Sequence, residues 1–193
     1  MAKAEIANPA PLGLAGFGLT TVLLSLINAG VLSEEAMGMV LGLAIIYGGG
    51  AQLLAGMWEF RTGNTFGSTA FTSYGAFWIS FYLLLTFGAS ATGIGAYLFM
   101  WGLFTFYMWI GTFYLNRALF WVFLTLWVTF ILLALGEWGM AAIGLIGGWL
   151  GLICGLIALY TSAAEVINTT AGRELLPVGK AMKKAGSPVG VSA

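Results

Sequence analysis

Polar but uncharged side chains recur at helical spacing in the first apolar segment of the sequence. Phe17, Thr21, Leu24 and Asn28 are spaced i, i+4, i+7 and i+11, so they share one helix face, and Thr20 lies beside them. In a bilayer, a hydroxyl or amide must either bond a neighbouring helix or face a wet path. The chemistry that this face offers is hydrogen bonding to a small polar solute.

The next two apolar segments continue the pattern. In the second, Gly48, Gln52 and Glu59 share a face, and the third begins with the hydroxyl-rich stretch 64–74. One back-bonded Thr in a helix is usually structural, but polar faces on three successive helices favour a pore. The side chains that we expect to bond a solute are Thr20, Thr21, Gln52, Asn64, Thr65 and Ser73.

No Lys or Arg lies in the middle of these segments to pair with a fixed anion. A solute would be stabilised by hydroxyl and amide donors and by helix N-termini, whose free N–H groups favour negative charge. This suits a small monovalent anion, a neutral weak acid or another small polar solute. Glu165, at the end of the last apolar segment, is expected to be a helix-end carboxylate, with a proton-coupling site as the alternative.

Several kinds of catalytic chemistry are excluded by missing residue types. The sequence has no His and no Asp, and Cys154 is its single cysteine. A disulfide within the chain is therefore impossible, and Cys/His metal sites and Cys–His nucleophilic pairs cannot be built. Cys154 lies among apolar neighbours and is expected to be a buried filler. We expect no enzyme activity, no cofactor and no metal site.

The composition indicates the solvent in which these segments lie. Of the 193 residues, 60% are hydrophobic and 7% are charged, and the mean hydropathy is +0.97. A soluble domain carries about 25% charged residues, so this chain cannot cover itself with a water-exposed surface. The net charge of zero gives no electrostatic footprint for nucleic acid. The protein is therefore expected to be embedded in a lipid bilayer.

Apolar runs between charged residues predict an all-α integral membrane protein with six spanning helices. A hydrocarbon core of about 30 Å requires roughly 20 apolar residues for each span. The alternating pattern of an outer-membrane barrel is absent, and no basic n-region precedes the first span, which is expected to be retained. The predicted spans are 12–30, 36–58, 67–88, 93–115, 118–136 and 140–164.

The basic residues set the predicted orientation, because Lys and Arg stay on the cytoplasmic side. All 7 of them precede the first predicted span or follow the second, fourth or sixth span. Both termini are therefore predicted to be cytoplasmic. We expect a short cytoplasmic N-terminus (1–10), a six-helix domain (11–165) and a cytoplasmic tail (166–193), with the tail solvated rather than bound to anionic headgroups.

Glycines one helical turn apart occur in two of the predicted spans. Gly38 and Gly42 open the second span, and Gly147, Gly151 and Gly155 run along the sixth. Small residues at this spacing let helix backbones approach closely in lipid. Packing within the bundle and a subunit interface account for them equally well, and both stay open.

The start of the first span carries a specific motif, Asn8-Pro9-Ala10-Pro11-Leu12-Gly13-Leu14. As a helix start it is physically reasonable, since Asn at the first position can cap and Pro suits the first turn. With the later stretches 47–49 (together with Gln52 and Gly56), 63–67, 69–75 and 148–155, it resembles the signature of the acetate uptake transporter family, the succinate/acetate permeases. The resemblance covers about residues 8 to 177.

The resemblance implies a hexameric architecture with six helices in each protomer and one pore per protomer. It also implies a pore narrowed by a Phe, a Tyr and a Leu, which map to Phe17, Tyr74 and Leu126. The first two lie in matching motifs, whereas Leu126 is placed by counting from Arg117. Ala158, placed in the same way, would be a neighbour that helps to set the size of the solute.

The function that the resemblance implies is uptake of acetate and succinate across the plasma membrane. The path would be channel-like or linked to protons. Two alternatives stay open: a channel for a small neutral solute such as urea or ammonia, and a membrane sensor that transports nothing. The expected partners are acetate, succinate, protons, the lipid bilayer and further copies of the chain in a homo-hexamer.

Overall fold

The computed structural model describes residues 6–184 and residue 186, and regular structure in this part of the chain is helical. Lys3 and the last residues of the expected tail lie outside the described residues. The helices are, in chain order, α1 (Ala10–Asn28), η1 (Glu34–Ala36), α2 (Met37–Ile45), η2 (Ile46–Ala51), α3 (Gln52–Thr62), α4 (Thr65–Thr86), α5 (Ala91–Thr112), α6 (Arg117–Glu137) and α7 (Ala141–Ala171).

Five helical segments of the described residues are long and apolar enough to cross a membrane. They are α1, the continuous run from Glu34 to Thr62, α5, α6 and α7. α4 has 22 residues, which is the length of a span, but its hydroxyl-rich first half makes it less apolar. The chain is thus an all-helical, multi-pass membrane protein, and the count of six spans stays a prediction.

The second predicted span is interrupted by a π-helix rather than being one regular α-helix. η2 lies between α2 and α3 and contains the glycines Gly48, Gly49 and Gly50. These glycines allow close packing: a Cβ on Gly48 would lie 2.7 Å from Thr20 Oγ1, and one on Gly16 of α1 would lie 2.6 Å from the Tyr47 carbonyl oxygen. π-helical turns often occur at functional sites, and Gln52 follows this one directly.

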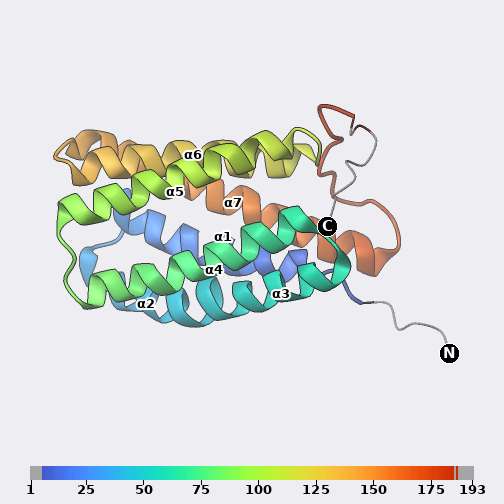
Figure 1. Ribbon diagram of the computed structural model, residues 1–193, viewed down its shortest axis with the longest axis horizontal. Helices are drawn as coiled ribbons and strands as arrows, with labels where there is room; N and C mark the ends of the chain where they lie inside the picture. Colours follow the sequence, from blue (N-terminus) through green and yellow to red (C-terminus); the bar gives the residue numbers. More distant parts are fainter. Residues whose placement is uncertain (1–5, 185, 187–193) are drawn as a thin grey trace, which may run out of the picture.

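The helices form one bundle in which segments far apart in sequence pack together (Figure 1). α1 packs along α7, α6 along α7, α5 along α6 and α3 along α4. Ser162 Oγ donates a hydrogen bond to the Pro11 carbonyl over 2.7 Å, so α1 begins beside the last third of α7. We call the end of the bundle where α1 begins and α7 ends the proximal end, and the opposite end the distal end.

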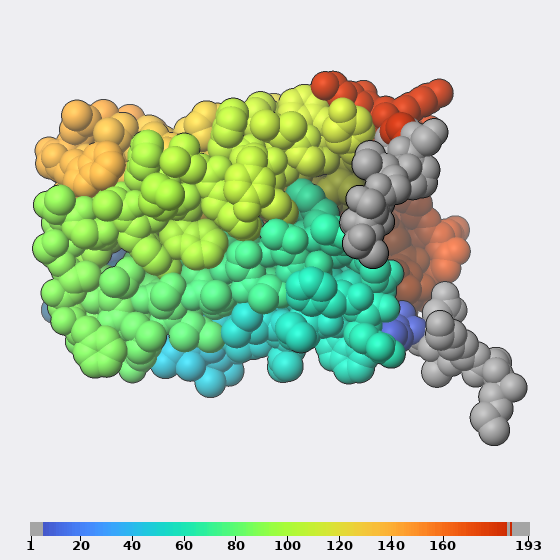
Figure 2. Space-filling model, viewed as in Figure 1, coloured from blue at the N-terminus to red at the C-terminus, as the bar shows by residue number. Residues whose placement is uncertain are grey.

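α5 lies on the face of the molecule that Figure 2 shows, and many of its exposed side chains are large and apolar. Because lipid tails rather than water contact such a surface in a bilayer, its exposure has no hydrophobic cost there. The exposed side chains of α5 alone include Phe99, Met100, Leu103, Phe106, Tyr107 and Ile110.

The family-like motif at the start of α1 forms a helix start, as expected. Asn8 Oδ1 accepts a hydrogen bond from the Ala10 N–H over 3.0 Å. Pro9 occupies the N-cap position, and Pro11 lies within the first turn, where a missing N–H leaves no hydrogen bond unmade. The motif therefore fixes where the first helix begins.

The last helix is longer than predicted, and the chain after it packs back onto the bundle. α7 continues to Ala171, beyond the predicted end at 164, and stops at Gly172, whose φ of +64° is a left-handed helix cap. Asn168 Oδ1 then accepts hydrogen bonds from the N–H groups of Leu175 and Leu176. The helix thus runs past the predicted end of the span, because side-chain capping of the downstream backbone cannot be read from hydropathy, and the domain boundary at 165 stays a prediction.

Candidate pore

Two cavities lie end to end inside the bundle and share Phe17 and Leu126 in their linings. The proximal cavity measures about 110 Å³ and the distal cavity about 140 Å³. Phe17 on α1 is 5% exposed and Leu126 on α6 is 3% exposed. We call these two side chains the partition. The arrangement brings together two of the three residues expected to narrow a pore.

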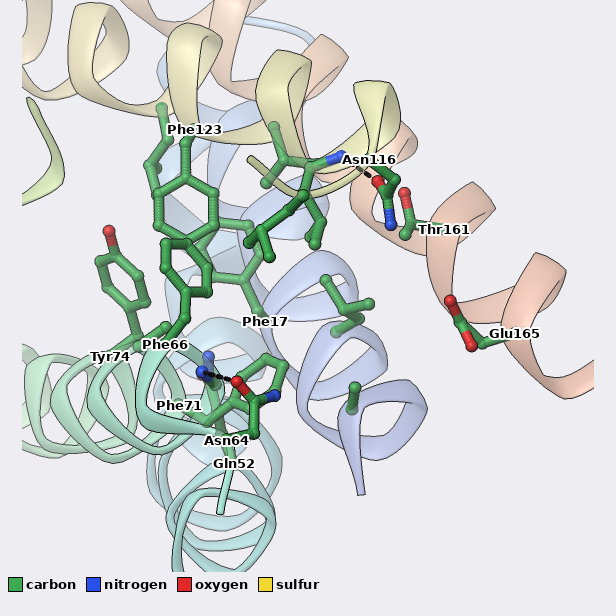
Figure 3. A pocket seen from close by; sticks show the side chains of 18 residues that line it. Phe17, Gln52, Asn64, Phe66, Phe71, Tyr74, Asn116, Phe123, Thr161 and Glu165 are labelled. Atoms are coloured by element: carbon green, nitrogen blue, oxygen red, sulfur yellow. Dashed lines mark hydrogen bonds between the residues drawn. The ribbon is translucent and has the colours of Figure 1, made fainter. Parts of the chain in front are cut away.

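The proximal cavity has aromatic walls on one side and a polar mouth. The rings of Phe66, Tyr74 and Phe123 gather on one side, and Thr161 and Glu165 of α7 lie on the other (Figure 3). Two asparagines at the mouth cap helices, since Asn64 Oδ1 accepts from Gly67 N–H over 3.0 Å and Asn116 Oδ1 accepts from Leu119 N–H over 2.8 Å. The remaining lining residues are Ala10, Leu14, Phe17, Gln52, Gly67, Ala70, Phe71, Leu115, Leu119, Val122 and Leu126.

Tyr74 contributes its ring to the proximal cavity, beside the partition. Its ring centroid lies 5.8 Å from that of Phe17, at an interplanar angle of 45°. Its hydroxyl lies 2.9 Å from Thr105 Oγ1 on α5, and Thr105 Oγ1 in turn donates to the Trp101 carbonyl. The Tyr74 proton is therefore committed to Thr105, and Tyr74 meets a solute chiefly as an aromatic surface.

The distal cavity is lined by the predicted face of the first span. Phe17, Thr21, Leu24 and Asn28 all line it, as their helical spacing predicts. The other walls come from aromatic and aliphatic side chains of α4, α5 and α6, with Met37 of α2, and Glu137 lies at the end of α6. The Thr21 hydroxyl and the Asn28 amide of α1 therefore belong to residues that line a cavity.

Unpartnered polar atoms lie on both sides of the partition. Gln52, which is 1% exposed and lines the proximal cavity, makes no hydrogen bond with either side-chain amide atom. On the distal side, the hydroxyls of Thr21 and Thr129 are also buried without a partner. Buried polar atoms in proteins are nearly always satisfied. These three side chains therefore have hydrogen-bonding capacity available for water or a solute.

The other expected solute ligands lie outside the two linings, or have their polar atoms occupied. Thr20 donates back to the Gly16 carbonyl over 2.8 Å, and Asn64 Nδ2 donates to Glu59 Oε2 over 2.9 Å. Thr65 is exposed, Ser73 is half-buried, and Ala158 is fully buried in the core cluster, and none of the three lines either cavity. Direct solute contact by these residues is still only a prediction.

Carboxylates, not cations, are the charged groups of the two cavities. Glu165 lines the proximal cavity and Glu137 the distal one, and neither lining contains Lys or Arg. Asn8 Nδ2 donates to Glu165 Oε2 over 3.3 Å. Glu59, which is 2% exposed, lies behind Asn64 at the proximal end and also accepts from Thr62 Oγ1.

Several lining residues were missed because their types do not distinguish a cavity from a core. The aromatic walls occur in apolar helices, where a Phe is also typical of ordinary packing between helices. Thr129 gave no separate signal, because a single Thr in a helix is commonly back-bonded, as Thr125 is to the Trp121 carbonyl here. The missed lining residues include Phe66, Phe71, Phe123, Asn116, Thr129, Thr161 and Glu137.

Metal-ligating groups do not gather anywhere in the described part of the chain, where no cluster of three His, Cys, Asp or Glu side chains is found. Cys154 is buried, and its Sγ lies 3.4 Å from the Val122 carbonyl oxygen. The two cavities offer hydrogen bonds to a small polar solute, and apolar side chains separate them.

Several known proteins similar to this chain are named as transporters or channels. It is 47% identical over 188 residues to the succinate-acetate/proton symporter SatP of Escherichia coli K12, covering 93% of this chain and 99% of that protein. It is 38% identical to acetate permease A of Emericella nidulans, covering 90% of this chain and 66% of that one. A yeast relative, ammonia transport outward protein 2 of Saccharomyces cerevisiae, is 40% identical over 175 residues, covering 84% of this chain and 62% of that protein.

A solved structure has the same fold. The chain in "Structure of the bacterial acetate channel SatP" matches with a TM-score of 0.86 and 49% identity, over 91% of this chain and all of that one. The sequence profile of the GPR1/FUN34/yaaH family matches residues 1–179. This chain therefore belongs to the GPR1/FUN34/yaaH family.

Proposed function

We propose that this protein carries acetate across the plasma membrane through the two cavities, with Phe17, Tyr74 and Leu126 forming the constriction. The observation that carries the proposal is the set of unpartnered polar atoms on Gln52, Thr21 and Thr129, which flank the apolar partition. Acetate matches this arrangement, because its carboxylate accepts hydrogen bonds while its methyl group passes between apolar side chains. The relatives named for acetate support the same solute.

The ionised form of acetate is the species that the path must accommodate. A simple carboxylic acid titrates near a pKa of about 4.3, so only ~2% of it is neutral near pH 6. A bare carboxylate in an apolar setting has a large desolvation penalty. Donors from Gln52 on one side and Thr21 on the other shorten the stretch over which the anion lacks hydrogen bonds. Proton dependence of uptake then arises from the driving force on the acid, and succinate is a second solute.

We further propose the assembly of the chain as a homo-hexamer with one pore per protomer. The pore domain covers residues 11–165, and an enzymatic activity is not part of this function. Glycines of α7 that approach α1 and α6 within the protomer, such as Gly147, Gly151 and Gly155, are accounted for by packing in the bundle. Gly38 and Gly42 of α2 have open space beside them, which leaves them available for a subunit interface.

Ammonia is a second candidate solute, favoured by one observation. Both cavities contain a carboxylate and neither contains a cation, a charge distribution that attracts ammonium to the mouths. An uncharged ammonia molecule would then cross the partition. The yeast relative named for outward ammonia transport supports this alternative.

Flux of radiolabelled acetate into proteoliposomes tests the function directly. We expect uptake that unlabelled acetate and succinate reduce and that urea and ammonium do not. The assay should be run with and without a pH gradient and an ionophore, in order to separate a driving-force effect from coupling. Empty liposomes are the control. Protein that is assembled and intact but moves no acetate would refute the proposal, and inhibition by ammonium alone would favour the second candidate.

Cysteine labelling tests which cavity opens to the outside. In a Cys154→Ala background, Glu35→Cys at the distal end should react with an impermeant maleimide added to intact cells. Arg117→Cys at the proximal end should react only after the membrane is opened, because basic residues stay in the cytoplasm. Labelling of the Arg117 site in intact cells would overturn the predicted orientation.

A further inference from the structure

Each cavity of the path holds one carboxylate and no basic side chain, which is unexpected for a protein that passes an anion. Glu165 lies on α7 in the proximal cavity, and Glu137 ends α6 in the distal cavity. They come from different helices and lie at opposite ends of the bundle. A solute that crosses the whole path must therefore pass one acidic side chain before the partition and a second one after it.

The surroundings of Glu165 do not neutralise it. The groups that share its cavity from α1, α3, α4 and α6 are apolar or amide side chains and the phenol of Tyr74, all uncharged, and Glu165 accepts a hydrogen bond from the uncharged Asn8 amide. Thr161 lies one turn before it on the same helix. Asn116, the residue before α6, caps that helix: its amide oxygen accepts a hydrogen bond from the Leu119 N–H.

The surroundings of Glu137 are similar in kind. The groups that share its cavity carry no charge: they are Met37 of α2, apolar side chains of α4, α5 and α6 with the Trp78 indole and the Thr129 hydroxyl, and, from α1, Phe17, Thr21, Leu24, Ser25 and Asn28. Glu137 is exposed, so water screens its charge more than that of the half-buried Glu165. The effect of Glu165 on a passing anion should therefore exceed that of Glu137.

We infer that Glu165 and Glu137 form a charge filter, which admits singly charged carboxylates and holds back doubly charged ones. Coulomb energy is proportional to the charge of the solute, so a dianion meets about twice the repulsion of acetate at each carboxylate. Succinate would accordingly pass in its half-protonated, singly charged form. This inference deepens the proposed function and rests on it, since it names the charge class of the carboxylates that the same path accepts.

Size is the competing explanation for any preference for acetate over succinate, because the partition at Phe17 and Leu126 is narrow. The two explanations differ for monomethyl succinate, which is larger than succinate but carries one negative charge. A charge filter passes monomethyl succinate better than succinate near neutral pH, where both carboxyl groups of succinate are ionised. A size filter passes the ester no better than succinate.

The test measures uptake of labelled acetate, succinate and monomethyl succinate by the full-length protein in the same proteoliposomes, near neutral pH. The variants are Glu165→Gln, Glu137→Gln and the double variant, and the matched controls are Glu174→Gln and Glu35→Gln. These control residues are exposed acids at the proximal and distal ends that line neither cavity. Gln keeps the shape of the side chain and its hydrogen-bonding oxygen, so folding is expected to survive.

We expect Glu165→Gln to raise the succinate-to-acetate uptake ratio about twofold, Glu137→Gln about 1.5-fold and the double variant about threefold. The monomethyl succinate-to-acetate ratio should change much less, and the controls should leave both ratios unchanged. If acetate uptake is intact and the double variant keeps the wild-type succinate ratio, the charge filter is wrong. An equal rise for succinate and its monoester would also refute it, by indicating size. Absence of acetate uptake in the wild type would instead refute the proposed function.

Discussion

The two cavities are similar in size but differ in how their polar groups are used. In the proximal cavity, the amide oxygens of Asn64 and Asn116 cap the N-termini of α4 and α6, so much of its polarity serves the fold. In the distal cavity, Thr21 and Thr129 have hydroxyls without a partner. The proximal cavity has one side chain, Gln52, in that condition. A polar residue in a cavity lining is therefore a candidate solute contact only where its polar atoms have no hydrogen-bond partner within the protein.

Both cavities share the partition as a common wall. Phe17 and Leu126 come from α1 and α6, and their position depends on close packing of α1 against η2 on one side and α7 on the other. If this packing is lost, the partition should be displaced, and the walls of both cavities should change together. Changes on one side of the partition should affect one cavity more than the other.

The largest effect is expected from Gly16→Ala, which removes the packing that both cavities need. The new Cβ would lie 2.6 Å from the Tyr47 carbonyl oxygen, a backbone atom that cannot move aside easily. We expect the free energy of unfolding to fall by about 3 kcal/mol and acetate uptake to be lost. Thermal unfolding in detergent measures this, with Gly38→Ala as control because nothing lies within 4 Å of its added Cβ. Equal stability of the two variants would contradict the packing argument.

Leu126→Ala should widen the partition and admit larger monocarboxylates such as lactate. We expect lactate uptake relative to acetate to rise roughly tenfold, together with a cost of about 2–5 kcal/mol in stability. Amounts of folded protein must therefore be compared alongside flux. Leu54→Ala is the control, since Leu54 is 61% exposed on the outside of the bundle. Well-expressed Leu126→Ala protein with unchanged selectivity would remove Leu126 from the constriction.

Gln52→Leu and Thr21→Val compare the unpartnered groups on the two sides of the partition. Gln52 has two free polar atoms and Thr21 has one, so we expect acetate uptake to fall about tenfold for Gln52→Leu and about threefold for Thr21→Val. Initial rates over a range of acetate concentrations give both maximal rate and KM. Thr125→Val is the control, because the Thr125 hydroxyl bonds the backbone of its own helix. If Thr125→Val reduces acetate uptake as much as Thr21→Val does, the role of unpartnered polar atoms is refuted.

The smallest effect is expected from Glu165→Gln on acetate. Removing one negative charge from the proximal cavity should raise acetate uptake no more than about twofold and leave its dependence on external pH in place. Uptake measured at several external pH values tests this. If stable Glu165→Gln protein loses pH-dependent uptake that the wild type retains, Glu165 is a coupling site and the channel-like mechanism is wrong.

Residues that carry local signals were placed well from the sequence. The face Phe17, Thr21, Leu24 and Asn28 lines the distal cavity, because helical periodicity alone decides which side chains of one helix point the same way. The hydroxyls of Thr20 and Thr105 look the same in sequence as that of Thr21. Back-bonding occupies Thr20, and Thr105 also binds Tyr74, whereas Thr21 has no partner. That distinction depends on rotamers and on neighbouring helices.

Hydropathy and the residue 8–14 motif are local properties, and they were enough to identify a helical membrane protein of the GPR1/FUN34/yaaH family. The fold was needed to place Gln52 after a π-helix in the proximal cavity, to set Phe17 and Leu126 between the two cavities, and to bring a carboxylate to each side of them. Burial and unmet hydrogen bonds are properties of groups of helices. They depend on which residues of α1, α3, α4, α6 and α7 face one another, and no single segment contains that information.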